Sequence, residues 1–212
     1  MKWTTVVVGS EGVLADFLER AAAPGELADS DIVIVPTAAA FSGATEAAVR
    51  VAALIEGLAA RVEALMVTDR TSATEEYFAA RIRAARVVVL VDGAALHARS
   101  TWRDTAVGEA LRDARTLVAI GTVATVIGAE MVDPRGGAPT TGLALREGAV
   151  ITTPASDDQL ARTRDLVEAL VLMIVVDAEG AVVESGGAWS QLSPSGVHAT
   201  RGHDEVRLAR AD

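Results

Sequence analysis

The chain alternates between short continuous runs of apolar residues and longer segments in which apolar residues recur at helical spacing. The continuous runs predict buried strands at Trp3–Val8, Ile32–Val35, Val62–Val67, Val87–Val91 and Leu117–Ile120. The segments between them predict helices over Val13–Ala22, about Thr45–Ala60, Thr74 to about Ala84, and Thr101–Asp113. Strands that alternate with helices imply right-handed crossovers, and therefore an open, mainly parallel sheet between two layers of helices, as in flavodoxin-like α/β proteins.

The pattern changes after Met131. Residues 133–139 are a loop by composition, 149–152 predict a short strand, and 157–170 predict a helix capped by Ser156 or Asp157. Short apolar runs separated by glycine-containing turns follow, and they predict strands at Met173–Val176, Ala181–Val183, Ala188–Trp189, Val197–His198 and Val206–Leu208. We expect a C-terminal antiparallel β extension over about 172–212, within a single domain that spans 1–212.

The loops that follow the parallel strands are the natural place for a ligand site, because ligands bind at the carboxyl ends of the strands in open sheets. We expect the loops that begin at Gly9, Thr37, Thr68, Asp92 and Gly121 to face one rim. Gly121-Thr122-Val123-Ala124-Thr125 leads from a strand into residues 126–131, which we expect to form a short buried helix. A glycine-led turn between strand and helix is the geometry of a nucleophile elbow. Its third residue is Val123, which has no atom able to act as a nucleophile.

The sequence also predicts the backbone conformation of this turn. The nucleophile of an elbow usually has a positive φ, a strained conformation that costs about 1–3 kcal/mol and is worse for a β-branched residue. Thr125 and Val126 are also bulkier than the small residues that let a helix cross close to its strand. We therefore predict a relaxed elbow with a negative φ at Val123.

Composition narrows the classes of partner. A net charge of −10 argues against nucleic acid and against anionic membranes, both of which favour basic proteins. The absence of cysteine excludes disulfides, thiolate metal sites and cysteine nucleophiles. The first residues lack a signal-peptide layout and no apolar run reaches the ~18 residues of a membrane span, so we expect a cytoplasmic protein. Scattered histidines at 97, 198 and 203 predict no metal site, and we predict no cofactor.

Several segments resemble, in order, the conserved segments of the peptidase E and cyanophycinase family, which are serine hydrolases with a class I glutamine amidotransferase-like fold. The resemblance runs from about Ile32 to the C-terminal strands, and it rests on Ile34–Ala38, Val91–Ala94, Gly121–Val126, Asp133–Gly136, Thr141–Leu145 and Val176–Val182. The first three of these resemble the family's Pro-Thr-Ala-Ser, Gly-Gly-Asn and Gly-x-Ser-Ala-Gly-Ala segments.

The chain differs from the family pattern at the positions that carry the family's catalytic residues and shape its substrate pocket. The family serine aligns with Val123, the family histidine aligns with Ala155, and Gly-Gly-Asn becomes Asp92-Gly93-Ala94. The resemblance therefore implies a non-catalytic homologue that keeps the cleft for a small-molecule or peptide ligand or for a partner. The candidate cleft-lining residues are Asp92, Gly93, Ala94, Gly121, Thr122, Val123, Ala124, Thr125, Asp133, Arg135 and Asp157.

Two other classes of function stay open. The chain could be a hydrolase of peptide or amide bonds that uses Thr122 or Thr125, although no histidine lies near them in sequence. It could also be a structural subunit whose Ala- and Val-rich faces form a homodimer. Near the Asp92 loop, Arg99, Trp102 and Arg103 are expected to form a solvated helix face with one packed Trp, and His97 to be an exposed helix residue.

Overall fold

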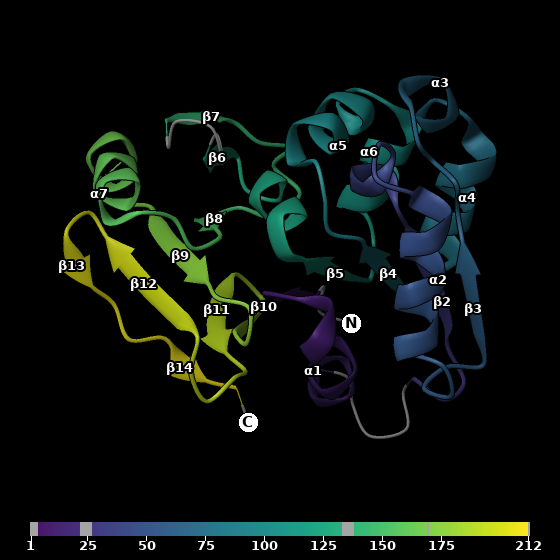
Figure 1. The fold of residues 1–212 in the computed structure, drawn as a ribbon, viewed down its shortest axis with the longest axis horizontal. Helices are drawn as coiled ribbons and strands as arrows, with labels where there is room; N and C mark the ends of the chain where they lie inside the picture. Colours follow the sequence, from purple (N-terminus) through teal and green to yellow (C-terminus); the bar gives the residue numbers. More distant parts are fainter. Residues whose placement is uncertain (1–3, 22–26, 133–137, 169, 212) are drawn as a thin grey trace.

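The structure, a computed structural model, describes residues 4–21, 27–132, 138–168 and 170–211 (Figure 1). Within these residues, eight strands form a sheet in the order β14-β11-β10-β1-β5-β4-β2-β3. The parallel part consists of β1 (Thr4–Val8), β2 (Asp31–Val35), β3 (Arg61–Ala64), β4 (Val87–Leu90) and β5 (Thr116–Ile120). The predicted strands of the first half are therefore confirmed, although β3 ends at Ala64 and not at Val67.

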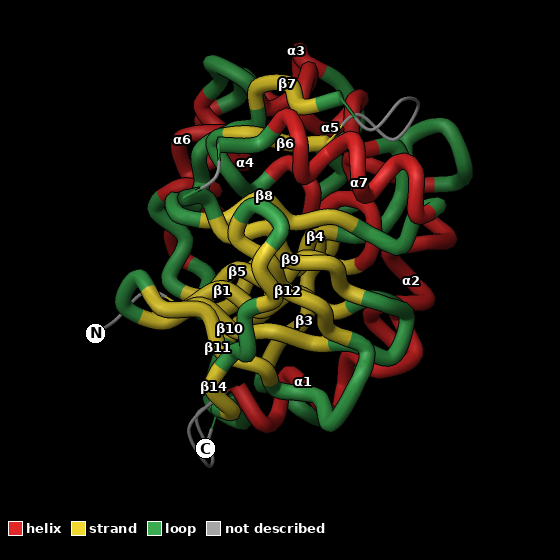
Figure 2. Tube along the Cα trace, turned by 90° about the vertical axis from the view of Figure 1, so that its left-hand side faces the viewer, coloured by secondary structure: helices red, strands yellow, loops and turns green. Residues whose placement is uncertain are grey.

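Side chains of the parallel strands alternate between two cores, because successive residues of a strand point to opposite faces of the sheet. Val33 and Val35 of β2 pack with one layer of helices, whereas Ile32 and Ile34 pack with the other. The first layer contains α4 (Glu76–Ala84), α5 (Ala95–Trp102) and α6 (Ala106–Arg112), and the second contains α1 (Leu14–Ala21) and α2 (Ala44–Leu54). The predicted three-layer α/β architecture is confirmed (Figure 2).

The C-terminal strands divide between two sheets. β10 (Ala181–Ser185) pairs antiparallel with β1 and extends the main sheet through β11 (Ala188–Gln191) and β14 (Ala209–Arg210). A second sheet has the order β13-β12-β9-β8, from β8 (Ala149–Thr152), β9 (Leu172–Val176), β12 (Val197–Arg201) and β13 (Asp204–Glu205). The antiparallel extension is confirmed, except that β8–β9 and β11–β14 are parallel pairs and that Val206–Leu208 is not a strand.

The predicted helix over Thr101–Asp113 is wrong, because the chain breaks it into α5 and α6. Asp104 has a φ of 53° at the break. Thr105 then caps α6, since its hydroxyl accepts a hydrogen bond from Gly108 N at 3.2 Å. A side chain at Gly108 would place its Cβ 2.0 Å from Trp102 O, so glycine lets the second helix begin against the end of the first.

Smaller corrections concern helix ends. The expected loop over Thr68–Ser72 contains the short helix α3 (Arg70–Ala73), which begins at a capping box between Asp69 and Ser72. Thr74 does not cap α4, because its hydroxyl donates to Thr71 O. The helix α2 ends at Leu54, before the predicted Ala60. The helix α7 (Asp157–Leu166) is capped by Ser156, one of the two caps predicted, and it ends before the predicted Leu170.

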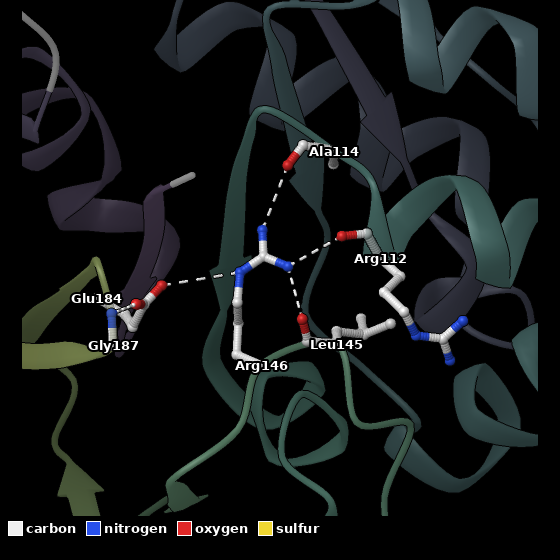
Figure 3. A network of polar contacts seen from close by, with 6 residues as sticks. All are labelled: Arg112, Ala114, Leu145, Arg146, Glu184 and Gly187. Atoms are coloured by element: carbon white, nitrogen blue, oxygen red, sulfur yellow. Dashed lines mark hydrogen bonds and ion pairs between the residues drawn. The ribbon is translucent and has the colours of Figure 1, made fainter. Parts of the chain in front are cut away.

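A buried arginine ties three parts of the fold together (Figure 3). Arg146 Nη1 donates to Arg112 O at 3.2 Å and to Leu145 O at 2.6 Å, and Nη2 donates to Ala114 O at 3.3 Å. Its Nε lies 3.8 Å from Glu184 Oε2 on β10, and the two side chains are 10% and 7% exposed. Burial lowers the pKa of Arg146, and the nearby Glu184 charge opposes that shift. The end of α6 is thereby joined to the C-terminal extension.

No helix within the described part of the chain is long and apolar enough to span a membrane.

Candidate functional site

The loops that follow β2, β3 and β4 are joined to one another by hydrogen bonds. The bonds are Thr37 Oγ1 to Val67 O at 2.5 Å, Ala94 N to Ala38 O at 2.7 Å, and His97 Nε2 to Thr68 O at 2.8 Å. Trp102 is fully buried and donates from Nε1 to Thr37 Oγ1 at 3.0 Å. The loops at Thr37, Thr68 and Asp92 therefore lie together as predicted, and the expected packed Trp102 supports them through its bond to Thr37. Gly9, in the loop after β1, donates instead to Gly180 O.

The elbow is a tight turn whose left-handed residue is Gly121, with a φ of 59°. Residues 121–126 continue as a 3₁₀ helix. The only described non-glycine residues with a positive φ are Asp104 and Ala144, so the predicted relaxed backbone at Val123 is confirmed. The left-handed residue is thus the first of the turn and not the third, and glycine adopts this conformation without strain.

The predicted buried helix over residues 126–131 is wrong. The 3₁₀ helix ends at Val126, and Glu130–Val132 forms β6, which pairs with β7 (Pro139–Thr141). The backbone carbonyls that an α-helix would use internally are taken by another segment. Leu143 N donates to Val126 O, Leu145 N to Ile127 O, and Ala144 N to Gly128 O, at 2.8–2.9 Å. These bonds bring residues 143–145 against the end of the elbow.

The side chain at the third residue of the elbow faces the core. Val123 is 0% exposed and Ala124 is 1% exposed, and both belong to the core cluster between the sheet and the α4–α6 layer. Both residues therefore lie behind the cleft and not in its lining. A residue at position 123 could not present a reactive atom to solvent in this conformation.

Asp92 fills the space in front of the turn. Its Oδ1 accepts hydrogen bonds from Gly93 N and from Thr122 N, each at 2.7 Å. A Cβ at Gly121 would lie 2.6 Å from Asp92 Cγ, so the carboxyl group packs directly against the glycine. The carboxylate thus occupies backbone N–H groups from two neighbouring loops.

A pocket of about 110 Å³ opens beside the elbow. It is lined by Thr122, Thr125, Val132, Thr152, Thr153, Pro154, Ala155, Gln159, Leu160 and Thr163. Thr122, Thr125 and Ala155 were named from the sequence, and the fold brings them together. Sequence reasoning missed the residues from the end of β8 and from α7, which only the packing of the second sheet places here. The lining within the described residues carries hydroxyl and amide groups but no ionisable side chain.

Only some hydroxyl groups of this pocket form hydrogen bonds within the described part of the protein. Thr152 Oγ1 donates to Thr153 O at 3.2 Å, and Thr163 Oγ1 donates to Gln159 O at 2.8 Å. Thr125 is 3% exposed, and its Oγ1 has no hydrogen-bond partner among the described residues. A buried hydroxyl without a partner is costly, and a bound water or ligand is one physical explanation for it.

The remaining candidates lie elsewhere. Ala94 caps α5 and is exposed, and Asp157 begins α7 with an exposed side chain outside the pocket lining. Asp133 and Arg135 lie outside the described residues. Their predicted place in the cleft lining stays a prediction.

The histidines do not approach the pocket. His97 is half-buried and not exposed as expected, because its ring packs against Phe41 with ring centroids 4.5 Å apart. His198 and His203 are exposed and lie near Asp177 and Asp165, at 3.9 and 3.2 Å. None of the three histidines lines the pocket.

The arginines that follow the Asp92 loop donate hydrogen bonds, mainly to backbone carbonyl groups of the segment after the elbow. Arg99 donates to Thr141 O and to Thr141 Oγ1, and Arg103 donates to Gly142 O at 3.5 Å. Burial and the charge of Arg103 lower the pKa of Arg99. These side chains hold the segment after the elbow in place.

The parallel sheet between two layers of helices, the glycine-led turn and the C-terminal strands together form a peptidase E-like α/β fold. The chain is similar to the crystal structure of a peptidase from an acI-B1 Actinobacterium, with a TM-score of 0.75 and 18% identity over all of this chain and 96% of that one. It is also similar to a protein from Listeria monocytogenes EGD-e described as peptidase E, with a TM-score of 0.67 and 12% identity over 92% of this chain and 100% of that one. At these identities the similarity shows the fold alone. No protein-family model and no curated protein sequence matches the chain.

Proposed function

We propose that this protein is a non-catalytic homologue of the peptidase E and cyanophycinase hydrolases, and that it binds a small molecule or peptide in the threonine-lined pocket. The observation that carries the proposal is the fully buried valine at the elbow position. Valine offers no nucleophile, and its side chain faces the core.

The surroundings of the elbow support the same proposal. Ala155, which aligns with the family histidine, lines the pocket with a methyl group. No described lining residue can act as a general base in place of that histidine, and the three histidines lie elsewhere. Asp92 occupies the backbone donors at Gly93 and Thr122, which leaves them no capacity to stabilise a developing oxyanion.

The chemistry of the pocket favours a small neutral group as the ligand. Its volume of about 110 Å³ is a few times the ~30 Å³ that one water occupies in the liquid, so it accommodates one short side chain or a few-atom fragment. Its lining combines threonine hydroxyls and the Gln159 amide with apolar groups from Val132 and Leu160. This mixture suits a hydroxyl or amide group attached to a short hydrocarbon.

Hydrolysis tests the first half of the proposal. The parent protein, Val123→Ser and the double variant Val123→Ser/Ala155→His are compared on a panel of acidic and basic dipeptide amides. We expect all three to be inert, since position 123 faces the core. Turnover by the parent overturns the non-catalytic assignment, whereas turnover by the double variant alone shows that the elbow can present residue 123 to solvent.

Binding tests the second half. Thermal unfolding of the parent and of Thr125→Val is measured with acetamide, propionamide and isobutyramide, with sodium acetate as a charged control. We expect at least one neutral amide to raise the Tm of the parent more than that of the variant, because valine keeps the shape of threonine and removes the hydroxyl. Equal or absent shifts in both proteins overturn the assignment of this pocket.

A second candidate function is hydrolysis with Thr122 or Thr125 as nucleophile. The unpartnered hydroxyl of Thr125 is the observation in its favour. It requires an activating base, and the described pocket lining has none. If the parent turns over any dipeptide amide, loss of that activity in Thr125→Val or Thr122→Val identifies the residue. The predicted homodimer stays a separate prediction, which analytical ultracentrifugation tests.

A further inference from the structure

Polar side chains gather on one face of the main sheet, where the C-terminal extension joins the core. Thr5 of β1 lies directly opposite Glu184 of β10, and Glu184 lies directly opposite Trp189 of β11. Side chains of residues opposed in this way point to the same face, with Cβ atoms about 4.5–5.5 Å apart. Trp189 belongs to the core cluster on the side of α4–α6, so the row faces inward. Arg146 reaches Glu184 from the segment after the elbow (Figure 3).

Each of these side chains buries a polar atom whose hydrogen-bonding capacity is unused. Thr5, Glu184 and Trp189 are 0%, 5% and 8% exposed. Within the described part of the chain, Thr5 Oγ1, Glu184 Oε2, Trp189 Nε1 and Arg146 Nε have no hydrogen-bond partner. Arg146 Nε and Glu184 Oε2 form an ion pair at 3.8 Å, which is too long for a hydrogen bond. Because even one buried polar group without a partner is costly, this cluster indicates a partner from outside the chain.

The chemistry of the unpartnered atoms identifies that partner. The indole Nε1 of Trp189 and the Nε of Arg146 can only donate, the ionised Glu184 can only accept, and the Thr5 hydroxyl can do either. A water molecule accepts two hydrogen bonds and donates two, which matches two donors and two acceptors. Glu184 would repel an anion and Arg146 would repel a cation, whereas the pair as a whole is neutral. A single neutral water therefore satisfies the cluster better than an ion.

We propose that Thr5, Arg146, Glu184 and Trp189 bind one buried water molecule at the junction between the core and the C-terminal extension. The water accepts from Trp189 Nε1 and Arg146 Nε, and it donates to Glu184 Oε2 and Thr5 Oγ1. It links β1, β10 and β11 to the segment that carries Arg146. None of these residues lines the threonine-lined pocket, so the inference holds whether or not that pocket binds a ligand.

NMR of the parent protein in water tests the inference. The indole N–H of Trp189 gives its own signal in a ¹H–¹⁵N spectrum, and the loss of that signal in Trp189→Phe assigns it. We expect cross-peaks between this proton and water, with opposite signs in NOESY and ROESY spectra. Opposite signs distinguish contact with a long-lived water from exchange of the indole proton. The Thr5 hydroxyl can also relay magnetisation from solvent, so the same spectra are recorded for Thr5→Val, in which the cross-peaks should persist.

Two NMR results would overturn the inference. One is a parent whose Trp189 indole proton shows no dipolar contact with water, and the other is loss of the cross-peaks in a folded Thr5→Val. A crystal structure of the parent that resolves ordered water is the second measurement, and it decides the question if Thr5→Val does not fold. We expect one water about 2.7–3.2 Å from both Glu184 Oε2 and Trp189 Nε1. Direct hydrogen bonds from Trp189 and Thr5 to Glu184, with no water between them, would refute the site.

Discussion

Replacing Arg146 with methionine should destabilise the protein strongly. The substitution removes the guanidinium that contacts Arg112 O, Leu145 O, Ala114 O and the Glu184 carboxylate (Figure 3). Methionine approximates the length of the lost side chain, so the effect comes mainly from polar groups left without partners. Glu184 then keeps a single hydrogen bond, from Gly187 N at 2.6 Å.

The expected magnitude follows from burial. Removing one partner of a buried ion pair costs about 3–5 kcal/mol, because the other charge stays buried and uncompensated. With side chains 10% and 7% exposed, this pair belongs to the buried class. Thr5 and Trp189 flank Glu184 on the adjacent strands and bury an oxygen and a nitrogen without partners in the described structure. Because these groups can reorient toward Glu184, we expect the lower end of that range, about 3 kcal/mol.

Urea unfolding of the parent, Arg146→Met, Glu184→Gln and the double variant measures the effect. The double variant should recover most of the loss, since replacing both charges of a buried pair is often neutral. In a thermal melt, about 3 kcal/mol corresponds to roughly 6–12 °C for a domain of this size. A loss below about 1 kcal/mol in Arg146→Met would refute the reasoning, and so would a double variant less stable than either single one.

Three further predictions follow from the local geometry. Gly121→Ala should lower the free energy of unfolding, measured with denaturant, by about 1–3 kcal/mol, because the new Cβ meets the Asp92 carboxyl group and the φ at this position is left-handed. An unchanged unfolding midpoint would contradict this description of the turn. The Ser72 backbone N–H and hydroxyl lower the pKa of Asp69 below its ordinary 3.8, so its cap stabilises the fold above that pH and weakens as pH falls through the lowered value. The Tm advantage of the parent over Asp69→Ala should therefore be present at pH 7 and shrink at acid pH, and a constant gap contradicts this. Without ligand, Thr125→Val should be as stable as the parent or more stable by up to about 1 kcal/mol in the free energy of unfolding, since a buried unpartnered hydroxyl is removed. A clear loss of stability would indicate that the hydroxyl has a hydrogen-bond partner.

The sequence predicts the inner strands of the central sheet well, because β1, β2, β4 and β5 are buried on both faces. Continuous apolar runs such as Val87–Leu90 have no other stable place in a fold of this size. The break between α5 and α6 was missed because it depends on Gly108 packing against the carbonyl of Trp102. The helix expected after the elbow failed for a similar reason, since residues 143–145 take its carbonyl acceptors. Both errors come from tertiary contacts that no local pattern encodes.

The residues of the candidate site also divide into those that the sequence identifies and those whose position depends on tertiary packing. The sequence identifies the rim and the elbow, because each follows a strand in a predictable order, whereas position 155 comes only from the resemblance to the peptidase E family. It does not identify Thr152, Gln159 or Thr163, since their proximity to the elbow depends on how the second sheet and α7 pack. Gln159 carried one local signal, the capping box with Ser156, but that signal predicts only the start of a helix.

Three features of the elbow are coupled through the backbone. A β-branched Val123 disfavours the left-handed conformation, which the chain instead adopts at Gly121. Residue 123 faces the core, and the Asp92 carboxyl group packs directly against Gly121, which has no Cβ. The carboxylate then takes the amide donor of Thr122, the residue between the glycine and the valine. A serine introduced at position 123 alone should therefore still face the core, because Gly121 and Asp92 hold the turn in its present form.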